Sequence, residues 1–295
     1  MKRILLVLYF LPVIIFAQVP LNTLTNQSSK EDDLMSLLND DVNFKISSTF
    51  KAVKIVNSQS VELVNEGDLL FLIQHRFGTL NSGAYNLYGL DNAQVRFGLD
   101  YGINDWSSIG LGRSSFLKTI DANVKVKLVS QSKGEYSFPF SIVLYSSSFF
   151  KQEIKNIQAE DYHFLDQISY VNQVLVASKI NSALSIQITP TSVHKNIISK
   201  GEAHDLLSVG LGARHKLTSR ISLNAEYFIQ LYNENSINPL SLGFDIETGG
   251  HVFQFHLSNS AAMFERAFIH ETLGKWFNGD IYFGFNISRV FTLKK

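Results

Sequence analysis

The 295-residue sequence contains no cysteine, which excludes disulfide bonds, thiolate metal sites and lipid attachment through an N-terminal cysteine. Neither sign of charge is in excess, because 26 lysines and arginines balance 26 aspartates and glutamates, and this leaves no electrostatic footprint for nucleic acid. Beyond the N-terminus, no apolar run approaches the ~20 residues that a membrane-spanning helix needs. If the mature chain crosses a membrane, it must therefore cross as a closed β-barrel.

Residues 1–17 are typical of a secretory signal peptide. Lys2 and Arg3 precede an apolar run over residues 4–16, and Ala17 supplies a small residue before the polar Gln18. A retained membrane anchor is the alternative, but the run is shorter than a spanning helix. We therefore expect an exported mature chain whose first part, residues 18–43, is a flexible acidic leader.

From residue 67 onward, apolar and polar residues alternate in one stretch after another. Leu207, Val209 and Leu211, for example, alternate with Ser208 and Gly210. Successive side chains of a strand point to opposite faces, so the pattern predicts strands with one apolar and one polar face. Candidate strands lie at residues 67–78, 91–103, 106–117, 120–130, 138–149, 166–180, 183–192, 204–216, 220–231, 239–247, 251–259 and 280–291. The registers of 138–149 and 166–180 stay open, because these two stretches show no clean alternation.

The lengths of the links between strands favour a membrane barrel. Tight turns at residues 104–105, 181–182, 218–219 and 248–250 alternate with longer links at 79–90, 150–165, 193–203, 232–238 and 260–279. Outer-membrane barrels have short periplasmic turns and longer outer loops, and an even strand number leaves both termini in the periplasm. Two links depart from this rule: 118–119 is short for an outer loop, and 131–137 is long for an inner turn.

A soluble β-sandwich would give the same alternation, with one face buried and one face in water. Against it, the apolar face carries large lipophilic residues in strand after strand, and the polar face mixes glycine and serine with charges. That mixture suits a crowded, watery lumen better than an open solvent face. We therefore predict an all-β protein with one antiparallel membrane β-barrel of about 12 strands over residues 67–292, placed in outer-membrane lipid.

Two segments have no clear place in the wall. Residues 44–66 carry apolar residues such as Phe50, Val53 and Ile55 at no regular period, and we expect this segment beneath the barrel or inside it as a plug. Residues 261–270 carry apolar residues at helical spacing, which predicts a short helix that caps the outer mouth or lies on the membrane surface. Its Phe264 and Phe268 are expected to pack against the barrel rim.

Several short runs resemble an uncharacterised outer-membrane β-barrel family of Bacteroidota, a domain of unknown function. These are residues 74–78 (QHRFG), 95–102 (VRFGLDYG), 109–113 (IGLGR), 190–191 with 194–196, and 249–254 (GGHVFQ). The resemblance covers roughly residues 44–292 and implies an outer-membrane location and a membrane-barrel fold. It brings no catalytic residue, because the family has no established activity. One departure is that four residues follow the last aromatic, Phe291, where many outer-membrane proteins end.

The candidate functional site is the predicted lumen, whose polar face carries charges of both signs. The predicted lumen-lining charges are Arg76, Arg96, Asp100, Lys125, Lys127, Lys179, Arg214, Lys216, Arg220, Glu226, Asp245 and Glu247. One interpretation is a lattice of salt bridges that makes a narrow barrel rigid. The other is a pore with a mild preference for anions, because charged rings set selectivity. Barrels of eight strands are filled by side chains and barrels of 16–18 strands hold a channel, so an intermediate size leaves both open.

No motif for catalysis or metal binding stands out. The histidines have neither the spacing of a helical zinc motif nor a compact cluster, and Ser208 and Ser222 lack an activating motif. We expect no catalytic, metal-binding or cofactor-binding residue and no cofactor. The predicted function is passive or ligand-specific passage of small solutes. The alternatives are a closed scaffold barrel that binds a protein partner of unknown kind through its outer loops or N-terminal segment and, third, an enzyme at the rim.

Overall fold

The computed structural model describes residues 44–46, 48–151, 167–198, 203–231 and 236–294. The features below belong to one compact unit, residues 43–295. The expected signal peptide and leader lie outside the described residues. No helix in the described part of the chain is long and apolar enough to span a membrane.

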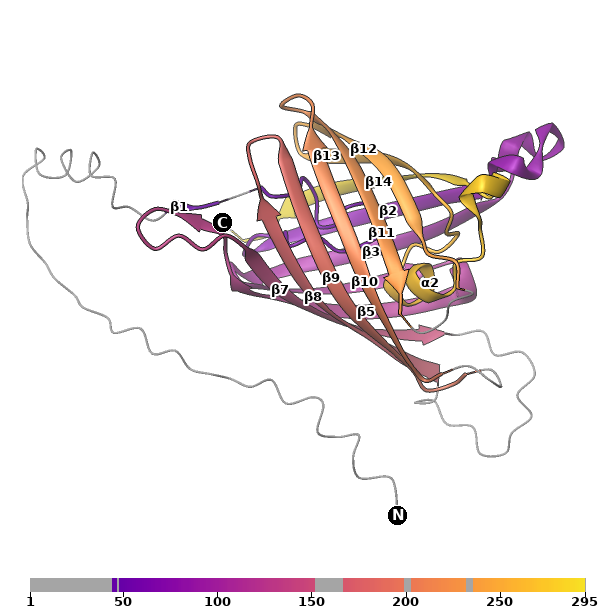
Figure 1. Cartoon of the computed structure of the whole chain (residues 1–295), viewed down its shortest axis with the longest axis horizontal. Coiled ribbons are helices and arrows are strands. Elements are labelled where there is room, and N and C mark those ends of the chain that lie inside the picture. Colours follow the sequence, from indigo (N-terminus) through magenta and orange to yellow (C-terminus); the bar gives the residue numbers. More distant parts are fainter. Residues whose placement is uncertain (1–43, 47, 152–166, 199–202, 232–235, 295) are drawn as a thin grey trace, which may run out of the picture. The chain divides into compact units, whose positions relative to one another are not determined.

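Twelve antiparallel strands form a closed barrel (Figure 1). Strands that follow one another in sequence pair with each other, and the last, β14 (Tyr282–Thr292), pairs with the first, β2 (Asp68–Thr79), to close the ring. Between them lie β3 (Ala93–Asn104), β4 (Ser107–Ser114), β5 (Thr119–Val129), β7 (Ser141–Lys151), β8 (Ile168–Lys179), β9 (Leu184–Lys195), β10 (Asp205–Lys216), β11 (Ile221–Gln230), β12 (Leu240–Thr248) and β13 (His251–Ser258). The predicted fold class and strand number are thus confirmed.

The alternation of side chains gives the barrel an apolar outer face and a mostly polar inner face. In β10, Leu207 and Leu211 are 54% and 46% exposed, whereas Ser208 and Arg214 are 2% and 5% exposed. The strand register places exposed apolar side chains beside one another, because Leu211 lies opposite Ile188 of β9 and Tyr227 of β11. A band of exposed apolar side chains around a ring without free edges is the surface of a barrel in lipid.

The two strands with open registers, β7 and β8, carry apolar residues on both faces. Val143, Tyr145 and Leu175 point inward and are completely buried. They form one cluster with Phe50 and Ile55 from the region before β2, so they face protein. The alternation of apolar and polar residues is lost in β7 and β8 because their inner face packs against another part of the chain.

The barrel end at which β2 begins and β14 ends is called the near end, and the opposite one the far end. The near-end links after β3, β8, β10 and β12 are tight, but the link from β5 to β7 is long and contains β6 (Ser132–Lys133). β6 pairs with β1 (Phe44–Lys45), and Ile46 N–H donates to the Gln131 carbonyl at 2.7 Å. The long near-end link therefore holds the chain just before it passes into the barrel.

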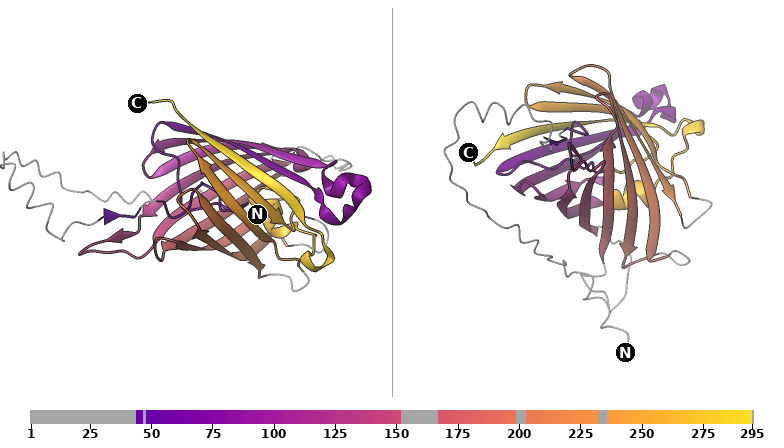
Figure 2. Two further views of the ribbon diagram at one scale, coloured as in Figure 1. Left: turned by 90° about the horizontal axis from the view of Figure 1, so that it is seen from above. Right: turned by 60° about the vertical axis from the view of Figure 1, so that its left-hand side comes forward.

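The far-end links carry short helices. The link after β2 contains η2 (Leu80–Ser82) and η3 (Ala84–Gly89), the link after β4 contains η4 (Phe116–Lys118), and the link after β13 contains α2 (Glu265–His270) and η6 (Trp276–Asn278). α2 lies within the ring of strands (Figure 2). Phe264 and Phe268 are completely buried. A helix is therefore present at the expected residues. Of its two expected positions, the one on the membrane surface is wrong, because its apolar side chains pack against the inner wall at the far end.

Candidate functional site

The candidate site is the interior of the barrel, and its main occupant is residues 48–66, called the lumen segment below. The segment bends back on itself: Ile55 N–H donates to the Ser58 carbonyl and Ser60 N–H to the Val53 carbonyl, both at 2.9 Å. Nearly every residue from Thr49 to Val61 is buried. Figure 2 shows this part of the chain (indigo) inside the ring of strands. Its buried backbone groups must therefore find hydrogen-bond partners on the wall.

The amide groups at the tip of the lumen segment converge on one carboxylate. Glu226, on β11 and 3% exposed, accepts hydrogen bonds from the N–H groups of Val56, Asn57 and Ser58 at 2.9–3.3 Å. The Ser58 hydroxyl donates to the same carboxylate at 2.7 Å. Successive backbone N–H groups that point to one concavity bind anions well. The tip thus supplies the hydrogen bonds that this buried carboxylate would otherwise receive from water.

The carbonyl groups of the lumen segment meet side-chain donors from several strands. Lys125 Nζ on β5 donates to the carbonyls of Val53 and Ser60, both at 3.1 Å. Further donors are Gln254 to Lys54 and Ile55, Asn286 to Val56, Gln187 to Gln59, and Arg214 to Thr49, at 2.8–3.2 Å. Gln187 also accepts from Val61 N–H at 3.1 Å. Most of the contacts between wall and segment therefore involve the main chain of the segment.

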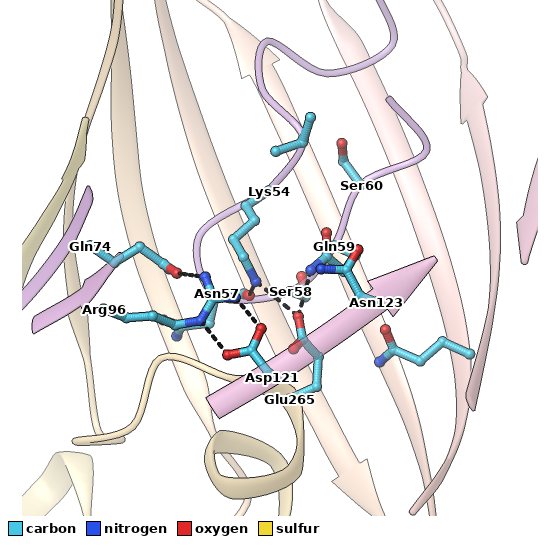
Figure 3. A network of polar contacts seen from close by, with 12 residues as sticks. Lys54, Asn57, Ser58, Gln59, Ser60, Gln74, Arg96, Asp121, Asn123 and Glu265 are labelled. Atoms are coloured by element: carbon cyan, nitrogen blue, oxygen red, sulfur yellow. Dashed lines mark hydrogen bonds and ion pairs between the residues drawn. The ribbon is translucent and has the colours of Figure 1, made fainter. Parts of the chain in front are cut away.

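Two buried arginines on neighbouring strands complete this part of the wall. Arg96 on β3 pairs with Asp121 on β5 through two nitrogens and donates to Gln74 Oε1 at 2.9 Å (Figure 3). Arg76 on β2 donates to Asn57 Oδ1 at 2.6 Å and to the Ser260 carbonyl. Arg96 is thus neutralised by the wall itself, whereas Arg76 depends on the lumen segment and on the link after β13.

A second segment, residues 262–269 around α2, fills the far end of the lumen. Phe264 and Phe268 pack against the inward side chains of Phe149 and Phe228, with Val171 and Val193 in the same cluster. At the boundary of the two segments, Lys54 Nζ lies 2.8 Å from Glu265 Oε1, and Gln59 Nε2 donates to the same oxygen at 2.8 Å (Figure 3). The two segments that fill the lumen therefore meet through a buried ion pair.

Two titratable groups of the α2 region have shifted pKa values. Burial alone would raise the pKa of Glu265, but the ammonium group and hydrogen bond of Lys54 bring it below the ordinary value of 4.5. Burial, together with the nearby Lys195, lowers the pKa of His270 from 6.5 to about 4. At neutral pH, Glu265 is therefore charged and paired, and His270 is neutral.

The structure places the predicted lumen charges in two groups. Inside the barrel and buried are Arg76, Arg96, Lys125, Arg214, Glu226 and Asp245, and half-buried is Asp100, which accepts from Asn123 at 3.4 Å. Partly or fully exposed toward the near end are Lys127, Lys179, Lys216, Arg220 and Glu247, of which Glu247 pairs with Lys51. In the first group, Arg76, Lys125, Arg214 and Glu226 form hydrogen bonds with the lumen segment. In the second group, Glu247 contacts the segment through its pair with Lys51.

Sequence reasoning missed three charges that matter here. Asp121 lies on the same strand face as Lys125, so the alternation of β5 already marks it as inward. Lys54 and Glu265 lie outside the strands, where no period of two exists, and only their burial in the folded chain identifies them. No pattern in the sequence links Lys54 to Glu265, which are 211 residues apart.

The residues considered for catalysis and metal binding are dispersed. His256 on β13 is 2% exposed with Nε2 2.9 Å from Arg76 Nη2, and Ser222 accepts from Arg214 at 3.1 Å. In the described part of the chain, neither Ser208 nor Ser222 forms a hydrogen bond with a histidine. Among the same residues, no group of three His, Cys, Asp or Glu side chains could hold a metal ion.

A closed ring of antiparallel strands with an apolar outer band and a polar interior defines the molecule as a membrane β-barrel. Residues 50–291 match the family described as "Membrane bound beta barrel domain (DUF5777)", and the chain belongs to this family. The expected resemblance is thereby confirmed as a membrane-bound barrel domain of unknown function.

Solved structures similar to this chain include the NanC porin, with a TM-score of 0.47 and 7% identity over 77% of this chain and 100% of that chain. The KdgM porin has the same TM-score and identity, over 76% of this chain and 99% of that chain. Omp33, an outer membrane protein of Acinetobacter baumannii, has a TM-score of 0.42 and 9% identity over 77% and 99% of the two chains. No curated protein sequence matches the chain.

Proposed function

We propose that the protein is an outer-membrane channel for small solutes that is closed at rest by the lumen segment and α2. The location in the outer membrane rests on the signal-like N-terminus and on the membrane-barrel family, and the origin in Bacteroidota is part of the same proposal. The near end, with its tight turns, is then the periplasmic end, and the far end is the outer one.

The observation that carries this proposal is how the lumen segment is attached to the wall. In the described part of the chain, a single bridge between Glu66 and Gly102 is its only strand-type pairing with the barrel. Its hydrogen bonds to the other strands are made by side chains of the wall, so the segment can leave without opening the ring of strands. The wall that it would expose is polar on most strands, as a solute pathway requires.

The buried ion pair makes the two closing segments interdependent. Glu265 is 1% exposed, and its hydrogen bonds come from Lys54 and Gln59 of the lumen segment. Withdrawal of the lumen segment would leave this carboxylate buried without its partner, which costs about 3–5 kcal/mol. α2 would then be less stable in its place. The lumen segment and α2 thus leave the lumen together, which permits passage through the whole barrel.

Electrical recording from the purified protein in a planar bilayer tests the proposal. Deletion of residues 44–66, with the signal peptide retained, should raise single-channel conductance above that of the intact protein. Among the buried charged side chains of the strands, three cations (Arg76, Lys125 and Arg214) and one anion (Glu226) lose a partner in the lumen segment. A mild preference for anions is therefore expected. A change of gel mobility on boiling provides the control for assembly of the barrel. A truncated barrel that assembles and conducts no better than the intact one would contradict the proposal.

The second candidate is a closed scaffold barrel that binds a partner. It is supported by the dense filling of the far end, where Phe264 and Phe268 are 0% exposed within an apolar cluster. If the truncated barrel stays closed, the scaffold function is better supported than the channel function. The far-end links or the N-terminal region would then be the binding surface. We propose no enzymatic activity, because the residues that the structure describes show no arrangement of nucleophile and base that supports one.

A further inference from the structure

We propose that the inner wall is a peptide-binding site, so that the solute carried by the channel is a short polypeptide that bends into a turn. This inference rests on the proposed function, because the site becomes free only when the lumen segment has left. The lumen segment itself is the observed model of the ligand.

The wall contacts the lumen segment mainly through groups that recognise the peptide main chain. Lys125, Gln254 and Asn286 donate to main-chain carbonyls of the lumen segment, at 3.0–3.2 Å. Glu226 accepts from three consecutive main-chain N–H groups. Groups directed at the main chain recognise any peptide of suitable shape, because every residue except proline offers the same donor and acceptor.

One side chain of the wall combines a donor and an acceptor for the peptide main chain. Gln187 on β9 donates to the Gln59 carbonyl at 2.8 Å and accepts from Val61 N–H at 3.1 Å. A carboxamide that pairs with both groups of a peptide chain matches an amide ligand better than a sugar or a simple ion. With Glu226 at the tip and Gln187 beside the residues that follow it, the wall is complementary to a peptide chain that bends back on itself.

The wall also leaves space for the lumen segment. Gly212 on β10 lies against the Ile55 side chain, and a Cβ there would collide with the Ile55 methyl group. Gly243 on β12 similarly lies beside Val56 and the His256 Cβ atom. Side chains are therefore small where the bound chain comes closest to the wall. The site accepts an apolar side chain at the position of Ile55, in the cluster with Val143 and Leu175.

The test uses the full chain with Ile55→Asp, which places a charge in the apolar cluster and should displace the lumen segment; Ile55→Ser is the milder second variant. The probe is a synthetic, fluorescently labelled peptide with the sequence of residues 48–66. Its binding is measured by anisotropy in detergent and its effect on current in a planar bilayer. Three further probes are the same peptide N-methylated at residues 56–58, a scrambled peptide of the same composition, and a neutral oligosaccharide of similar mass.

The peptide should bind to either variant and reduce its current, and binding to the unsubstituted protein should be much weaker because the site is occupied. N-methylation should weaken binding by about tenfold or more, since hydrogen bonds to the charged Glu226 are lost. The scrambled peptide should bind within about tenfold of the parent peptide, because main-chain contacts dominate. The oligosaccharide should not compete.

Equal binding of the methylated peptide, or competition by the oligosaccharide, would overturn the inference. Binding of the parent but not of the scrambled peptide would also overturn it, because the wall would then recognise only its own segment. The experiment distinguishes a failure of the peptide site from a failure of the proposed channel function. A variant that conducts but binds no peptide refutes the peptide site alone, and a variant that binds peptide without conducting refutes passage alone.

Discussion

The ion pair between Lys54 and Glu265 is the most direct point at which to perturb the closed state. Lys54→Met keeps the aliphatic stem but removes the ammonium group that lies 2.8 Å from the carboxylate. Both side chains are buried, with 3% and 2% exposed, so the remaining charge cannot be hydrated while the barrel is closed. Removal of one partner from a buried pair costs about 3–5 kcal/mol. Because 1.4 kcal/mol corresponds to a factor of ten, the ratio of open to closed barrels should rise by about 100-fold or more.

Planar-bilayer recording of open probability measures this ratio, and the chain offers a matched control. Lys51 pairs with Glu247 at the near end, where the two side chains are 17% and 44% exposed. Such a pair contributes roughly 0–1 kcal/mol, so Lys51→Met should change open probability little. In the double variant Lys54→Met/Glu265→Gln the buried charge is gone, and the closed state should recover in part. If Lys54→Met opens the barrel no more than Lys51→Met does, the interdependence of the two closing segments is refuted.

Three further predictions concern the lipid face, the lumen and pH. Leu211→Arg should destabilise the assembled barrel by about 2–4 kcal/mol near the middle of the bilayer, measured by denaturant unfolding in lipid vesicles. An undisturbed barrel would mean that this face is not in lipid. Gly212→Val should press on Ile55 and increase conductance without loss of assembly, and unchanged current would show that the segment can shift within the lumen. Acidification should open the barrel: the pKa of Glu265 is lowered from 4.5, so the stabilisation from its pairing is complete above that value and is lost as the pH falls through the lower folded-state pKa. Glu265→Gln should abolish this acid transition in a pH series of bilayer recordings, and a transition that persists would assign it to another group.

Strands with an apolar outer face and a polar inner face could be found from the sequence alone. In β10 the alternation of Leu207, Ser208 and Leu211 is strict, because lipid lies on one side and polar contacts lie on the other. The tight near-end turns were visible for a similar reason, since turn-forming residues interrupt each pattern. The same parity predicts that Arg76, Lys125 and Glu226 point inward, and in the structure these three side chains are buried.

The rest of the site depends on contacts between parts of the chain that are distant in sequence. Val143 and Leu175 are inward and apolar only because Phe50 and Ile55 pack against them, and the register of β7 and β8 was ambiguous for that reason. Glu265 gives no local signal of burial, because a charged residue in a far-end link is ordinarily solvated. Only the folded chain brings it to Lys54. The strands without a clean pattern are thus ones whose inner face packs against apolar residues of the lumen segment.

The pairing of β1 with β6 has a mechanical consequence. The lumen segment is fixed at both ends, by the start of β2 on one side and by the two-residue ladder of Phe44 and Lys45 with Ser132 and Lys133 on the other. It is therefore a closed loop inside the barrel rather than a loose tail, and the short ladder is its weakest attachment. A pull on the chain before Phe44 would load this ladder first and unzip it at small force, before any strand of the ring was strained. Tension applied from the N-terminal side would therefore reach the lumen segment before it reached the wall.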